Sequence, residues 1–212
     1  MTHTIIIIDM GHGANCPGKC SPDGSFHEWK FNREVGKALG DALSERGFTV
    51  RYTHEADTEP LYPGKPMLSK AQLNECLRYR YAKVNEYCAQ YGSRNCLCIS
   101  IHANASGSTW SDARGFCAIV GRNASAASKR LAQSIYAEAA KAHLQGNRCV
   151  PPERYWTQPL AICEHTRCPA VLTESLFYTN RHDLALLQSQ EGKNTIVEVH
   201  LRGILNYLNH EK

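Results

Sequence analysis

Apolar residues along the chain alternate between short β-branched runs and longer stretches with helical spacing. The run Ile5–Ile8 is uniformly β-branched and predicts a strand buried on both faces. Val35, Leu39 and Leu43 recur at the spacing of a helix, and a second stretch of this kind spans 73–88. The pattern predicts strands at 5–8, 48–53, 96–101, 115–120 and 170–173, and helices at 27–46, 73–91, 125–143, 181–190 and 193–209. This alternation predicts a single α/β domain over 1–212, with a mostly parallel sheet flanked by helices.

Polar side chains capable of chemistry stand where several of these strands end. His12 follows the first strand between two glycines, His102 follows the strand at 96–101, and Glu174 follows the strand at 170–173. Because the carboxyl ends of parallel strands meet at one edge of a sheet, we expect these side chains to lie together. Glu28 is expected to join them from the first turn of the first helix, after a loop rich in glycine and proline.

Two histidines and two glutamates suit a divalent metal held by a His/Glu/His set, with one carboxylate left unliganded. Zinc hydrolases commonly take three protein ligands and keep a position for water, whose proton a nearby carboxylate accepts. The residue types leave open which glutamate is the ligand. Each residue also has a purely structural interpretation. The Glu28 carboxylate could stabilise its helix by interacting with the helix dipole, and the His102 side chain could hold a backbone group of a loop. The spacing does not match the short His-Glu-x-x-His motif, so it is not diagnostic by itself.

Composition narrows the class of protein. The chain has 212 residues, 42% hydrophobic and 21% charged, with a net charge of +4, which excludes a disordered or collagen-like chain. No basic arm or aromatic–basic interleaving predicts nucleic-acid binding. No apolar run approaches the ~20 residues of a membrane span, and the start lacks the basic region of a secretory signal. We therefore expect synthesis in the cytoplasm.

Ten cysteines are many for a chain of this length. Their even number permits disulfides, but the absence of a secretory signal favours reduced thiols. Cys96 and Cys98 are expected to point to one face of a strand, where small buried thiols are common. The pairs Cys16/Cys20 and Cys163/Cys168 are alternative metal clips, although neither has the spacing of a zinc ribbon.

Several motifs, taken in order along the chain, resemble one enzyme family. They are Ile-Ile-Asp-Met-Gly-His-Gly at 7–13, Glu28 after the glycine loop, Ile-Ser-Ile-His-Ala-Asn-Ala at 99–105, Arg-Gly-Phe at 114–116, and Pro-Ala-Val-Leu-Thr-Glu at 169–174. Together they resemble the zinc-dependent N-acetylmuramoyl-L-alanine amidases of the amidase-3 type. The resemblance runs from Ile5 to about Tyr207. It implies a single α/β domain with a mixed, mostly parallel sheet flanked by helices, of the phosphorylase/hydrolase-like type.

The resemblance implies a zinc ion held by His12, Glu28 and His102, with Glu174 as the catalytic carboxylate. It implies hydrolysis of the amide between N-acetylmuramic acid and L-alanine in peptidoglycan, in cell-wall remodelling or phage-type lysis, by a monomer that reaches the periplasm or the outside of the cell. Regulated members carry a long inserted helix before the last strand. The short segment at this place in the chain predicts a site that is open without an activator.

This chain departs from the family pattern at several positions. Met10 stands where a small residue is usual, and Ser-Leu-Phe at 175–177 replaces the usual Gly-Phe. Asp9 and Asn104 are predicted either to orient metal ligands or to cap a strand end and a loop. His27 is a weaker alternative ligand, and His165 is expected to be structural or substrate-facing.

Two other functions remain open from the sequence. The same residues would serve a zinc peptidase or carboxypeptidase acting on peptidoglycan stem peptides. A wall-binding protein with an inactive site is the alternative that involves no catalysis, although the presence of all four polar residues argues against it.

Overall fold

The strands form one mixed sheet that carries the candidate residues at a single edge. The computed structural model describes residues 4–210, and its six-stranded sheet has the order β2-β1-β3-β6-β4-β5. The strands are β1 (Ile5–Met10), β2 (Thr49–Tyr52), β3 (Cys96–Asn104), β4 (Cys117–Val120), β5 (Trp156–Thr157) and β6 (Ala170–Phe177). β2, β1, β3 and β6 run parallel, whereas β4 is antiparallel to β6 and parallel to β5. The predicted α/β fold class is therefore confirmed.

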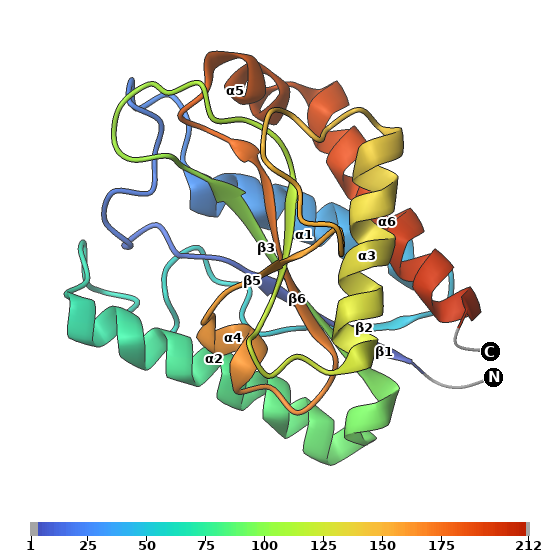
Figure 1. Ribbon diagram of the computed structural model, residues 1–212. Coiled ribbons are helices and arrows are strands. Elements are labelled where there is room, and N and C mark those ends of the chain that lie inside the picture. Colours follow the sequence, from blue (N-terminus) through green and yellow to red (C-terminus); the bar gives the residue numbers. More distant parts are fainter. Residues whose placement is uncertain (1–3, 211–212) are drawn as a thin grey trace.

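Helices cover both faces of this sheet (Figure 1). They are α1 (Glu28–Ser44), α2 (Lys70–Tyr91), the 3-10 helix η1 (Ser93–Asn95), α3 (Ala126–Lys141), α4 (Ala161–Glu164), α5 (Arg181–Gln188) and α6 (Gln190–His210). Helices α1, α3 and α6 pack on one face, and α2 and α4 pack on the other. No helix within residues 4–210 is long and apolar enough to cross a membrane.

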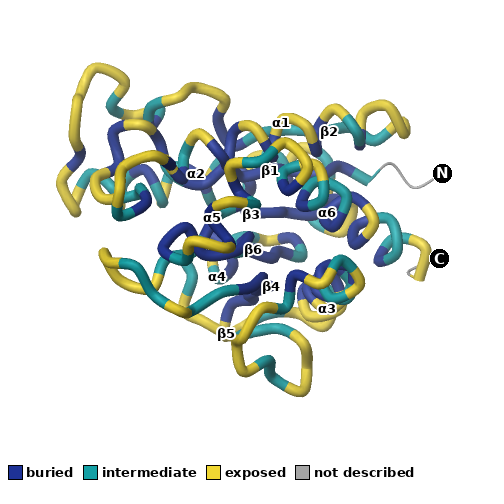
Figure 2. The backbone as a smooth tube through the Cα atoms, turned by 90° about the horizontal axis from the view of Figure 1, so that it is seen from above, coloured by how far each residue is buried: buried dark blue, intermediate teal, exposed yellow. Residues whose placement is uncertain are grey.

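The strand β1, which lies between β2 and β3, is buried on both sides, as its sequence predicts (Figure 2). Ile6 and Ile8 join the core against α1, α3 and α6, whereas Ile7 joins the smaller core against α2 and α4. Because side chains alternate along a strand, Asp9 stands on the face of Ile7. The same alternation places His102 of β3 on that face, with Cys98.

Two departures from the family pattern have local structural consequences. Met10 is fully buried, and its side chain occupies the space that a Cβ atom at Gly36 of α1 would need. Leu176 has a φ of 67°, close to a register shift between β3 and β6. This left-handed backbone conformation costs free energy in a residue other than glycine, and such residues cluster at functional sites.

The observed elements differ from the predicted ones mainly at their ends. Helix α2 begins at Lys70 rather than at residue 73, because Ser69 and Gln72 form a capping box. Strands β3 and β6 continue beyond residues 101 and 173, so His102 and Glu174 lie inside strands rather than after them. The short elements η1, β5 and α4 carry too few residues to show a periodic pattern and were not predicted.

Candidate metal centre

His12, Glu28 and His102 converge at the carboxyl edge of the sheet from separate elements. One nitrogen or oxygen atom from each lies within 4.8 Å of the others. The Nδ1 atom of His102 is 3.0 Å from Oε1 of Glu28, and the Nε2 atom of His12 is 3.4 Å from Oε2 of the same carboxylate. The two imidazole rings meet edge to face with centroids 4.9 Å apart. The sequence-predicted metal residues are therefore brought together.

The backbone around His12 is shaped to present its ring. His12 has a left-handed φ of 57°, and its side chain keeps 23% of its surface exposed. The preceding Gly11 packs directly under the His102 ring, so that a Cβ atom at this position would overlap with the imidazole. Gly11 also donates its N–H to the Ile101 carbonyl, which ties the loop to β3. The close approach of the two histidines therefore requires glycine at position 11.

The protonation states of Glu28 and His12 suit binding of a cation, whereas the raised pKa of His102 opposes it. Burial opposes ionisation of Glu28, but the neighbouring His12 and His102 lower its pKa to about 2. Burial lowers the pKa of His12 to about 3, which leaves this imidazole neutral. Burial also opposes the charge on His102, yet the contacts with Glu28 raise its pKa. An ionised carboxylate and neutral imidazoles are the forms that bind metals, so a metal would compete with the His102 proton.

The donor set suits a zinc ion, which takes imidazole nitrogens and carboxylate oxygens as ligands. Ligand atoms on a tetrahedral zinc with bonds of 2.0–2.1 Å lie about 3.3 Å apart. The separations of 3.0 and 3.4 Å involve different oxygens of Glu28, Oε1 and Oε2, and one donor atom from each of the three residues lies within 4.8 Å of the others. Among the residues that the structure describes, no other group of three or more His, Cys, Asp or Glu side chains is close enough to hold a metal.

Glu174 stands beside this group without belonging to it. It pairs with His102 in the register of β3 and β6, so both side chains project from the same face. Its Oε2 atom is buried and has no hydrogen-bond partner among residues 4–210. Burial raises the pKa of Glu174 to about 7, against a smaller lowering effect of the His102 charge. A carboxyl group with this pKa can both accept and donate a proton near neutral pH.

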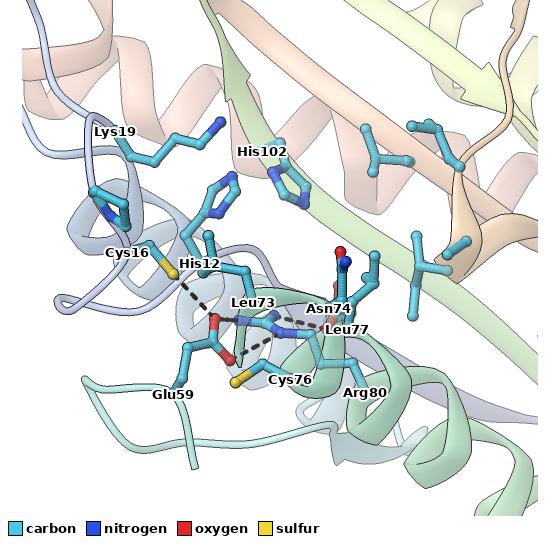
Figure 3. Close-up of a pocket in the computed structure, with 16 residues that line it drawn as sticks. His12, Cys16, Lys19, Glu59, Leu73, Asn74, Cys76, Leu77, Arg80 and His102 are labelled. Carbon is cyan, nitrogen blue, oxygen red and sulfur yellow. Dashed lines mark hydrogen bonds and ion pairs between the residues drawn. The ribbon is translucent and has the colours of Figure 1, made fainter. Parts of the chain in front are cut away.

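A cavity of about 260 Å³ opens next to the two histidines (Figure 3). Its walls come from the loop that carries Lys19, from α2 and from α4. Leu73, Leu77, Leu160 and Ile162 make much of this surface apolar. A largely apolar cavity with a few convergent polar groups is typical of a site for small ligands.

Asp9 is buried in a network of charges below this cavity. Arg80 of α2 lies 3.0 Å from Oδ1 of Asp9 and 2.5 Å from Oε1 of Glu59, and it donates to the Met10 carbonyl at 2.7 Å. Thr53 and Ser100 also donate to Asp9, each at 2.7 Å. The described contacts of Asp9 are thus with this network and not with the metal candidates. The network anchors the end of β1, from which the His12 loop departs.

The other residues that the sequence analysis singles out, two histidines, Asn104 and the cysteines, lie outside the metal group. His27 is exposed at the start of α1 and is outside the metal group. The His165 ring packs against Tyr81, and the Asn104 side chain accepts a hydrogen bond from the Ala105 N–H. All ten cysteines are unpaired, and none is in the metal group. Cys96 and Cys98 share one buried cluster, as the strand pattern predicts.

Substitution of Gly11 by alanine tests how closely the His102 ring is held. The added methyl group overlaps with the imidazole and must displace it. We expect zinc affinity to fall about 10–100-fold, the usual effect of disturbing the support of a metal ligand. Competition with a chromophoric chelator measures this affinity. Gly64→Ala is the matched control, because a Cβ atom there meets nothing within 4 Å. Parent-like zinc affinity in Gly11→Ala would show that the ring is not constrained by residue 11.

Comparison with known proteins identifies relatives over almost the whole chain. The model of the N-acetylmuramoyl-L-alanine amidase family Amidase_3 matches residues 6–206. The germination-specific N-acetylmuramoyl-L-alanine amidase of Bacillus subtilis is 28% identical over 204 residues, which cover 96% of this chain and 79% of that protein. The endolysin of Bacillus phage SPP1 is 42% identical over 53 residues, 25% of this chain and 20% of the endolysin.

Solved structures share the fold. The CwlD amidase from Clostridioides difficile, in complex with the GerS lipoprotein, has a TM-score of 0.81 at 24% identity over 98% of this chain and 99% of that one. The catalytic domain of CwlV, an N-acetylmuramoyl-L-alanine amidase from Bacillus (Paenibacillus) polymyxa, has a TM-score of 0.74 at 23% identity over 97% and 98% of the two chains. At these identities the likeness establishes the fold.

Proposed function

The chain belongs to the N-acetylmuramoyl-L-alanine amidase family and is an enzyme of that class, and we propose that it works with a zinc ion held by His12, Glu28 and His102. The observation that carries this proposal is the convergence of the three donor groups, with one donor atom from each within 4.8 Å of the others. The chemistry that zinc supplies in such sites is activation of water and polarisation of a carbonyl group. The substrate is peptidoglycan, cut between N-acetylmuramic acid and L-alanine.

Glu174 is proposed as the general base and acid of this reaction. Its half-buried side chain supports proton transfer in both directions near neutral pH, because Oε2 is buried without a hydrogen-bond partner among residues 4–210 and the pKa is about 7. It takes the proton of the attacking water and later passes it to the leaving amine of L-alanine. Glu28, whose pKa is about 2, stays ionised through this cycle and keeps its role as a ligand.

The metal and the bond cleaved are tested together in one digestion. We expect the purified chain, with no added protein, to bind about one zinc ion and to open muropeptides, leaving a free lactyl carboxylate and a new L-alanine amino terminus. Dialysis against a chelator should remove the activity, since the carboxylate and imidazoles alone do not polarise the carbonyl, and added zinc should restore it. Metal analysis and mass spectrometry of the products measure these outcomes.

The same digestion separates the alternatives. Cleavage within the stem peptide would identify a peptidase, and wall binding without any cleavage would identify an inactive binding protein. Activity that survives complete removal of metal would contradict the zinc assignment. Activity only after addition of a second protein would contradict the expectation that the site is open, and would also question the proposal that the chain acts as a monomer.

The biological setting is a separate matter from the chemistry. We propose that residues 1–212 form one catalytic domain that acts on the cell wall after release from the cytoplasm. Of the two relatives described above, one comes from a bacterium and one from a phage. The comparisons therefore support neither remodelling of the host wall nor phage-type lysis over the other.

A further inference from the structure

Among the residues that the structure describes, Lys19 is the cation lining the cavity beside the metal centre that has no ion-pair partner. The other charged groups that line this cavity, apart from the histidines, are Asp9, Glu59 and Arg80. These form ion pairs with one another and are buried. The Lys19 ammonium makes no ion pair or hydrogen bond with any other residue of the part of the chain from 4 to 210. Its charge is therefore available to a ligand.

The backbone of Lys19 is held against the metal centre. The Lys19 carbonyl accepts a hydrogen bond from the N–H of Glu28 at 2.9 Å. The next residue, Cys20, forms an antiparallel bridge with His27. The side chain leaves this anchored position and extends past His12 toward His102 (Figure 3). Its charge acts on the carboxyl groups of both Glu28 and Glu174. A lysine so placed lies within reach of a substrate bound at these residues.

We propose that Lys19 selects substrates that carry a free carboxylate close to the amide that is cut. A lysine ammonium is a compact charge on a mobile stem, which suits a carboxylate whose exact position varies among substrates. The apolar walls of the cavity lower the local dielectric and strengthen such an interaction relative to one in water.

This inference rests on the proposed amidase function and adds a preference among its substrates. Successive residues of an extended peptide are spaced by about 3.5 Å, so the residue after L-alanine is still close to the scissile bond. The preferred class is therefore a muropeptide whose residue after L-alanine bears a free carboxylate. The disfavoured class has a carboxamide at the same place, because the amide offers no charge to Lys19.

The test compares these two muropeptides, identical except for carboxylate or carboxamide on the residue after L-alanine. We expect the zinc-loaded wild-type enzyme to prefer the carboxylate by about tenfold in kcat/KM, the usual strength of a hydrogen bond to a charged group, mainly through KM. Lys19→Met should reduce this ratio to about one, and Lys19→Arg should retain most of it. Lys30→Met is the matched control, because Lys30 is exposed on α1 and does not line the cavity. It should keep the wild-type ratio.

Each result bears on the inference in a defined way. An equal ratio in wild type and Lys19→Met, with cleavage intact, overturns the inference and leaves the amidase function standing. A fall in kcat by the same factor for both substrates also overturns it, since Lys19 would then act at the reacting atoms. Failure of the wild type to cut the lactyl amide of either substrate overturns the proposed function and the inference with it. The inference is supported if Lys19→Met loses the preference for the carboxylate substrate while Lys19→Arg and Lys30→Met keep it.

Discussion

Replacement of Glu174 by glutamine is expected to lower kcat for muropeptide hydrolysis by about 10²–10⁴-fold, the usual contribution of a general acid–base. Glutamine keeps the shape of the side chain but cannot accept a proton from water. Glu174 is half-buried beside His102 and is outside the ligand group, so zinc content should remain at the parental value. Steady-state kinetics on a defined muropeptide, with metal analysis of the same preparation, measures both quantities.

The aspartate variant is the informative companion to this experiment. Glu174→Asp keeps a carboxylate but withdraws it by one methylene group. Since a misplacement of about 1 Å can cost about 10²-fold in rate, its activity should lie between those of the parent and Glu174→Gln. Hydrolysis by Glu174→Gln at the parental rate would rule out the proton-transfer role. Loss of zinc from Glu174→Gln would instead indicate that Glu174 belongs to the ligand set.

The sequence was sufficient to place the metal candidates because each stands next to a strong local signal. His12 follows a run of β-branched residues and lies between glycines, and Glu28 opens an amphipathic helix. His102 also continues an apolar run. Parallel pairing of β1 with β3, and of β3 with β6, then brings these signals to one edge. What the sequence leaves open is which glutamate faces both histidines, because that depends on how the first turn of α1 meets β3.

The charged network beneath the site does not follow from the sequence, because Arg80 and Glu59, unlike Asp9, belong to no motif. Arg80 falls in the helix predicted at 73–91, whose inner side is defined by apolar residues. Its spacing from Leu77 and Val84 places it on that same side, and an unpaired arginine is expensive to bury. A charged residue on an otherwise apolar helix face was therefore the available signal. Its partner Glu59 could not be found in this way, because it lies in an irregular loop with no periodic pattern.

Lys19 and Met10 illustrate a different limit of sequence interpretation. Lys19 lies in a loop, where no periodicity predicts the direction of a side chain. Its position depends on the hydrogen bond between its carbonyl and Glu28. Met10 is larger than the residue usual at its position in the family. Its side chain fits because Gly36 on α1 has no side chain and leaves the space that Met10 fills. Both features depend on contacts between distant segments, and a single sequence does not reveal such pairs.

Arg80→Met is expected to destabilise the protein by about 3–5 kcal/mol, because removing one partner of a buried ion pair leaves the other charges uncompensated. Arg80 is 4% exposed and bonds to Asp9 and Glu59, which are each 2% exposed. Denaturant unfolding at pH 7 measures the loss. Arg202→Met is the matched control, since the pair of Arg202 with Glu198 is exposed and worth at most about 1 kcal/mol.

The pH dependence of this loss identifies its cause. Burial opposes ionisation of Asp9, but Arg80 and the Ser100 and Thr53 hydroxyls hold the pKa of Asp9 well below its ordinary value. In the parent, the stability from ionised Asp9 is therefore present at neutral pH and is lost only as the pH falls through that lowered pKa. Without Arg80 the pKa rises, and protonation then relieves the uncompensated charge. The difference in stability between Arg80→Met and the parent should consequently shrink as the pH falls from 7 toward 4. A difference that stays constant over this range would mean that the loss comes from packing of the arginine side chain, and that the network is not held by charge.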